Sequence, residues 1–64
     1  MAPRFAEEIA EYLRVSGPAT FTGLSTHFAR WGATDEDVRV AVEWLLKEGR
    51  LARELDRFEK YHLK

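Results

Sequence analysis

The chain has 64 residues, of which 45% are hydrophobic, so we expect one compact domain over residues 1–64 and no second one. It has no cysteine, which excludes disulfides and thiolate zinc sites, and two histidines are too few for a metal cluster. Ten Lys or Arg against eleven Asp or Glu give a net charge of -1, which excludes a global attraction to nucleic acid.

Two absences bear on where the protein works. No apolar run approaches the ~20 residues of a membrane span, and no signal-peptide segment follows Met1, so we expect a cytoplasmic protein that does not bind membranes. The chain also has no Asn, no Gln and only one Met. Such a composition is typical of thermophile proteins, although a GC-rich genome also produces it.

The charges are unevenly distributed along the chain. Residues 1–46 carry four Lys or Arg against seven Asp or Glu, a net charge of -3, whereas residues 47–64 carry six against four, a net charge of +2. A surface that binds a polyanion is therefore expected at the C-terminal end.

The first predicted element is a helix from about Pro3 to Ser16. Proline suits the first turn of a helix, and Gly17 followed by Pro18 is a stop signal. Apolar residues at helical spacing form one stripe: Phe5, Ile9, Tyr12 and Leu13.

A short strand and a second helix are predicted next. Ala19 to Phe21 is long enough only for a stub of strand. Thr22 can cap a helix from about Gly23 to Trp31, and Gly32 closes it. On the first helix, we expect Tyr12 to be a core residue with a hydrated hydroxyl group. On this second helix His27 is expected to be a packed, hydrogen-bonded histidine.

The third helix has the clearest signals. Thr34 and Asp37 form a variant of the capping box, in which the side chain of each residue accepts a hydrogen bond from the backbone of the other. The helix is expected to run to about Glu48, and Gly49 ends it. Its apolar side is predicted to hold Val38, Ala41, Val42, Leu45 and Leu46.

Residues 50–64 are predicted to form a β-hairpin. Pairing Leu51 with Leu63 also sets Arg53 beside Tyr61 and Glu54 opposite Lys60. A register one residue shorter would set like charges against each other, so the first register is favoured. It leaves residues 56–58 as the tip and exposes His62 to solvent.

The order of helix, short strand, helix, tight turn, helix and hairpin resembles the winged helix-turn-helix family. Residues 42–55 resemble the end of that family's third helix, its glycine break and its first wing strand, and residues 61–63 resemble its closing strand. A narrower resemblance, over residues 21–28 and 61–64, is to the DsrD-like small winged-helix proteins. The resemblance implies an α+β fold, a three-helix winged helix-turn-helix with a C-terminal β-hairpin wing.

The family resemblance implies binding of double-stranded DNA by a small transcriptional regulator, because the third helix usually enters the major groove and the wing touches the backbone. The candidate DNA-binding residues are Arg30, Arg39, Lys47, Arg53, Arg57 and Lys60. The third helix also bears Glu36 and Glu43, which repel phosphates. The alternative is a solvated face, on which Glu43 pairs with both Arg39 and Lys47 at the i,i+4 spacing.

An alternative function is protein interaction, as a homodimer or as a subunit of a larger complex. Val40 and Trp44 project from the third helix away from its apolar side, and exposed aromatic side chains are common interface anchors. The candidate interface residues are Val40, Trp44, Trp31 and Phe58. The competing interpretation is that the third helix is central and buries both of its sides.

Catalysis is not expected. The sequence has no nucleophile elbow, phosphate-binding loop or metal-ligand spacing, and so small a domain has little room for a buried cleft. We therefore expect no catalytic residue, no metal and no cofactor.

Overall fold

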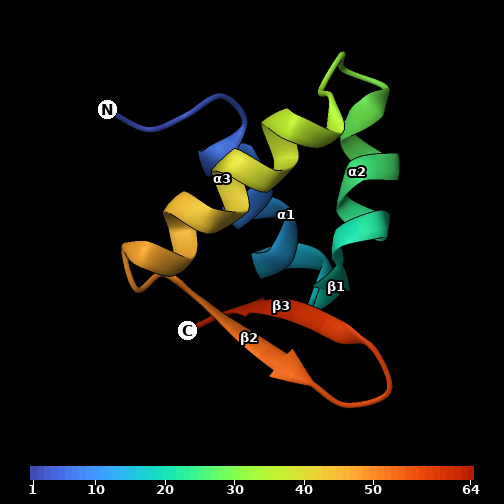
Figure 1. Cartoon of the computed structure of the whole chain (residues 1–64), viewed down its shortest axis with the longest axis vertical. Helices are drawn as coiled ribbons and strands as arrows, with labels where there is room; N and C mark the ends of the chain where they lie inside the picture. Colours follow the sequence, from blue (N-terminus) through green and yellow to red (C-terminus); the bar gives the residue numbers. More distant parts are fainter.

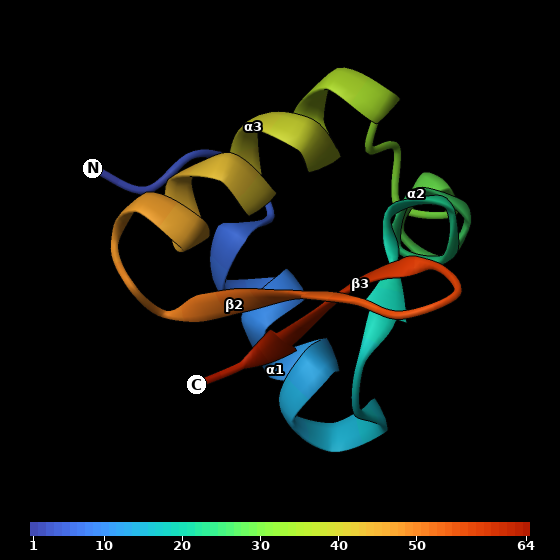
Figure 2. The same cartoon turned by 60° about the horizontal axis from the view of Figure 1, so that its bottom comes forward.

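The computed structural model describes all 64 residues as three helices and a three-stranded antiparallel sheet, a mixed α+β fold (Figure 1). The elements are α1 (Ala6–Ser16), β1 (Ala19–Thr20), α2 (Phe21–Ala29), α3 (Asp35–Lys47), β2 (Leu51–Leu55) and β3 (Glu59–Leu63). The strand order is β1-β3-β2. Helix α1 contacts both α3 and β3. The β2–β3 hairpin passes in front of α1 when the molecule is turned (Figure 2).

Helix α1 begins three residues later than the predicted start at Pro3. Phe5 has a φ of 67°, in the left-handed region, and this conformation breaks the helical path ahead of Ala6. Pro3 instead accepts a hydrogen bond from the Ala6 N–H in a turn before the helix, at 3.2 Å. The predicted end is confirmed, because Gly17 has a φ of 86° and its N–H bonds to the Leu13 carbonyl.

Helix α2 spans Phe21–Ala29, so its predicted bounds, Gly23 to Trp31, were wrong at both ends. The cap is Thr20 and not Thr22: the Gly23 N–H donates to the Thr20 hydroxyl oxygen at 3.0 Å. Thr20 is extended and is the last residue of β1, so the strand leads into the helix without a loop. Phe21 therefore belongs to the helix and not to the strand.

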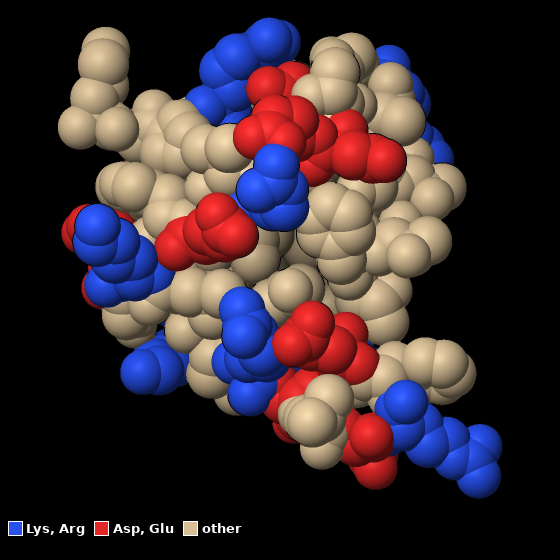
Figure 3. Space-filling view, viewed as in Figure 1, with Lys and Arg blue, Asp and Glu red and all other residues tan.

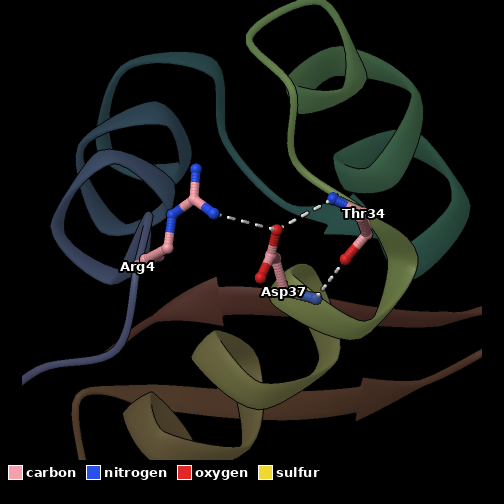
Figure 4. A network of polar contacts seen from close by, with 3 residues as sticks. All are labelled: Arg4, Thr34 and Asp37. Carbon is pink, nitrogen blue, oxygen red and sulfur yellow. Dashed lines mark hydrogen bonds and ion pairs between the residues drawn. The ribbon is translucent and has the colours of Figure 1, made fainter.

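The capping box of α3 is confirmed (Figure 4). The Asp37 N–H donates to the Thr34 hydroxyl oxygen, and the Thr34 N–H donates to a carboxylate oxygen of Asp37, both at 3.0 Å. Arg4 approaches the same carboxylate oxygen at 3.9 Å. The backbone hydrogen bond from Thr34 lowers the pKa of the Asp37 carboxyl below its usual value.

The predicted hairpin register is also confirmed. Leu51 pairs with Leu63, Arg53 with Tyr61, and Glu54 with Lys60, and residues 56–58 form the tip. The third strand of this sheet is the stub predicted at residues 19–21, but the sequence did not indicate that it pairs with the hairpin. The two residues of β1 pair with β3 and cover its other edge, Ala19 opposite Tyr61 and Thr20 opposite Lys60.

The core lies between α1, α2, α3 and the base of the hairpin. Its twelve buried residues are Ala6, Ile9, Ala10, Leu13, Leu24, Phe28, Val38, Ala41, Val42, Leu45, Leu51 and Tyr61. Only Leu51 and Tyr61 come from the hairpin. Beyond them the hairpin extends past the core, and Leu55 is 80% exposed.

The two threonines at the start of α2 and α3 provide a test of the caps. Thr34→Ala is expected to destabilise the fold by about 1 kcal/mol, or to lower the melting temperature by about 4–8 °C, because the Asp37 N–H loses its partner. Thr22→Ala is the matched control and should cause no loss, since Thr22 lies inside α2 and caps nothing. Thermal unfolding followed by circular dichroism measures both. Equal losses in the two variants would contradict the cap assignment.

Candidate binding surfaces

Two of the predicted DNA-binding arginines lie on the same side of the molecule. Arg39 of α3 and Arg53 of β2 both line a hollow of about 330 Å³ between α3 and the hairpin, here called the α3–hairpin hollow. Two carboxylates, of Glu43 and Glu59, line it as well. Tyr61 forms part of the wall, and burial raises the pKa of its phenol. The hollow therefore has equal numbers of positive and negative side chains.

Both arginines are already paired with carboxylates. Arg39 pairs with Glu36, at i,i+3, so the predicted pairing of Glu43 with Arg39 and Lys47 was wrong. The Glu36 carboxylate lies one turn toward the N-terminus on the same exposed face and takes the guanidinium instead. Arg53 lies 3.2 Å from Glu59, its diagonal neighbour across the hairpin, and its guanidinium is 5.9 Å from the Tyr61 ring centre.

The other predicted DNA-binding residues form no ion pair. Lys47 on α3, Lys60 on β3 and Arg57 at the hairpin tip have no carboxylate within 4.0 Å. Arg30 follows α2, outside the α3–hairpin hollow, and its guanidinium lies 5.4 Å from the Trp31 ring centre. Acidic and basic side chains alternate over the face that Figure 3 shows, which has no continuous basic area.

The four predicted interface residues are distributed over separate elements. Trp31, after α2, is 57% exposed and Phe58, at the hairpin tip, is 63% exposed, but they border different hollows. Val40 on α3 is 40% exposed. Trp44 is partly buried and packs against the core, so for this residue the central-helix interpretation holds.

The largest hollow, about 600 Å³ between α1 and α2, was not anticipated from the sequence. We call it the α1–α2 hollow. The Tyr12 and His27 rings stack in it with centres 4.1 Å apart, and the His27 and Trp31 rings are 5.1 Å apart. His27 is packed as expected, but by ring contacts, and no hydrogen bond holds its side chain. The signal that could have revealed the hollow is the spacing of aromatic residues on two neighbouring helices.

The second histidine has a local role. His62 is half-buried rather than facing solvent, and its Nδ1 lies 3.1 Å from the Leu63 carbonyl oxygen. It does not line any of the three hollows. No three His, Asp or Glu side chains gather at a place that could hold a metal ion.

One ion pair ties the first helix to the start of the hairpin. Both oxygens of the Glu7 carboxylate accept hydrogen bonds from Arg50, at 2.8 and 2.9 Å. These bonds lower the pKa of Glu7. On the same helix Arg14 pairs with Glu11 and lowers the pKa of that carboxyl too.

Comparison with known protein families, with curated proteins and with solved structures finds no match to this chain. None of its helices combines the length and the apolar character needed to cross a membrane.

The Glu7–Arg50 pair predicts a pH-dependent contribution to stability. Because the folded-state pKa of Glu7 is depressed, the pair stabilises the protein above the ordinary value of 4.5 and loses this effect as the pH falls through the folded pKa. Glu7→Gln should therefore lower stability at neutral pH, and the difference from the wild type should shrink in acid. Urea unfolding across this range measures it. Glu54→Gln is the control, because it removes an exposed carboxylate that has no Lys or Arg nitrogen within 4.0 Å. A Glu7→Gln deficit that persists undiminished in acid would disprove the assignment.

Proposed function

We propose that the chain is a winged helix-turn-helix domain that binds double-stranded DNA as a small regulator. In this assignment α2 and α3 are the helix-turn-helix, and the β2–β3 hairpin is the wing. The order of the elements and the antiparallel hairpin after α3 support it. Helix α3 would then approach the major groove while the hairpin meets the phosphate backbone.

The observation that carries the proposal is the placement of Arg39 and Arg53. They come from the two elements that contact DNA in this family, and they line one hollow. Lys47, Arg57 and Lys60 lie on the same two elements and have no carboxylate partner. These five side chains can follow a phosphate backbone across the helix and the hairpin.

The carboxylates on the same elements determine what kind of binding is expected. Exposed ion pairs contribute at most about 1 kcal/mol, so phosphates can replace Glu36 and Glu59 as partners of the arginines. Glu43 remains and repels the DNA backbone. Helix α3 offers only Arg39 and Lys47 as donors to base edges. We therefore expect low affinity, strong dependence on salt and little sequence discrimination.

DNA binding can be tested with a labelled duplex by fluorescence anisotropy at ~50 mM salt, where phosphate contacts are strongest. The Arg39→Ala, Arg53→Ala double variant should bind more weakly and show a shallower salt dependence, by about 0.9 in the log–log slope for each lost phosphate contact. Glu43→Gln should bind more tightly because a repulsive charge is removed.

Arg14→Ala is the matched control for these variants. It removes an exposed, ion-paired arginine on α1, which is not one of the proposed DNA-contacting elements, and should change affinity little. No binding of the wild type at low salt, or equal weakening by Arg14→Ala, would refute the DNA proposal.

A second candidate function is self-association through exposed aromatic side chains. It is favoured by Trp31 and Phe58, which expose 57% and 63% of their surface. Large exposed aromatic side chains often anchor protein interfaces.

Sedimentation over a range of protein concentrations tests self-association. If the aromatic side chains join two copies, the wild type should form dimers at high concentration, and Trp31→Ala or Phe58→Ala should shift the protein toward monomer. Val15→Ala, an exposed apolar residue on α1, is the control and should leave the dimer intact. A wild type that stays monomeric at every concentration would rule out this candidate.

A further inference from the structure

The α1–α2 hollow has an aromatic floor. Four rings line it, those of Phe5, Tyr12, Phe28 and Trp31, and the His27 ring stacks among them. Tyr12 and Phe28 meet edge to face with centres 5.8 Å apart. The volume of about 600 Å³ is in the range of ligand sites in proteins. The proposed DNA contacts on α3 and the hairpin include none of these residues.

The charged residues that line the α1–α2 hollow are all acidic. Glu7, Glu8 and Glu11 contribute carboxylates, and no Lys or Arg lines it. Glu7 and Glu11 are held by arginines of the same chain, and these hydrogen bonds keep the pKa of both carboxyls low. Glu8 has no ion-pair partner. The hollow therefore has one carboxylate whose charge no cation of the chain compensates.

Two of the lining rings already carry cations of this chain. The guanidinium of Arg4 lies 5.1 Å from the Phe5 ring centre, and that of Arg30 lies 5.4 Å from the Trp31 ring centre. Such distances are typical of cation–π contacts. No Arg or Lys lies over the Tyr12 ring.

We propose that the α1–α2 hollow binds a basic segment of a partner protein, with an Arg or Lys side chain stacked on the Tyr12 ring and paired with Glu8. The uncompensated Glu8 carboxylate matches a cationic ligand and would repel the phosphates of a nucleic acid. The hairpin tip of a second copy fits less well, because residues 54–60 carry three acids against two bases. The site is separate from the proposed DNA surface and does not depend on it.

The test uses a tetra-arginine peptide, acetylated and amidated so that only its side chains are charged. Its control is the same peptide with citrulline in place of arginine, which keeps the shape and removes the charge. The Trp31 indole N–H signal in a ¹⁵N–¹H spectrum reports binding, and Trp44→Phe leaves Trp31 as the only tryptophan. We expect the arginine peptide to shift this signal with a saturable, salt-sensitive dependence, and the citrulline peptide to shift it far less.

Variants then locate the site. Glu8→Gln removes the charge, whereas Tyr12→Phe removes only the hydroxyl group and keeps the ring. Loss of the charge should weaken binding about threefold to tenfold, whereas the phenyl ring retains most of the affinity. Glu54→Gln removes one negative charge on the hairpin and should leave the affinity unchanged. Arg39→Ala should also have no effect, so failure of this proposal and failure of DNA binding are distinguishable.

Three results would overturn the proposal. They are equal binding of the citrulline peptide, equal weakening by Glu8→Gln and Glu54→Gln, and no change of the Trp31 signal at the highest soluble peptide concentration. Glu8 is exposed, so Glu8→Gln is expected to fold, and its dispersed ¹⁵N–¹H spectrum verifies this in the same experiment.

Discussion

Two buried side chains, Leu51 and Tyr61, attach the hairpin to the helices. This attachment fixes where the exposed side chains of the hairpin lie relative to α3. Both buried side chains belong to the core; Leu51 lies at the base of the hairpin and Tyr61 halfway along β3. Side chains of a strand alternate between its two faces, so a slip by one residue would carry them out of the core. The same register sets Arg53 opposite Tyr61 and within reach of Glu59. The position of the basic side chains of the hairpin is thus a consequence of apolar burial.

Ion pairing explains why the face in Figure 3 has no continuous basic area although the chain has many arginines. Five arginines lie within 4.0 Å of a carboxylate: Arg4, Arg14, Arg39, Arg50 and Arg53. These pairs are exposed and individually weak, so they leave the arginines available to a stronger anion. They also lower the positive potential that a distant phosphate would experience. Any association with DNA would therefore depend on close contact rather than on long-range attraction.

The shape of the α1–α2 hollow depends on the backbone conformation before α1 and on ring contacts between α1 and α2. Phe5 has a left-handed conformation just before α1, and its ring lies 6.1 Å from that of Phe28 on α2. Farther along, Tyr12 stacks on His27. Because α1 also turns Ile9 and Leu13 into the core, its opposite face is left with the carboxylates. Helix α1 thus supplies the acidic residues of the hollow and the Tyr12 ring, while α2 supplies His27 and Phe28.

Features that depend on near neighbours along the chain could be predicted from the sequence. The capping box needs only Thr34 and Asp37, the end of α1 needs Gly17, and the hairpin register follows from cross-strand pairs within fifteen residues. Each of these is decided by hydrogen bonds or charges that residue spacing alone brings together.

Other features depend on contacts between segments that are distant in the sequence. Residue spacing does not specify the backbone conformations or the partners on which these features depend. They are the start of α1, the Thr20 cap, the pairing of β1 with β3, the Glu7–Arg50 ion pair and the α1–α2 hollow. Thr20 and Thr22 are equally good caps by residue type, and only the pairing of Thr20 with Lys60 in the sheet selects the first. Glu7 and Arg50 are 43 residues apart and meet only because α1 and the base of the hairpin share one core. Such contacts form when apolar burial brings distant segments together, and residue spacing in the sequence does not record that step.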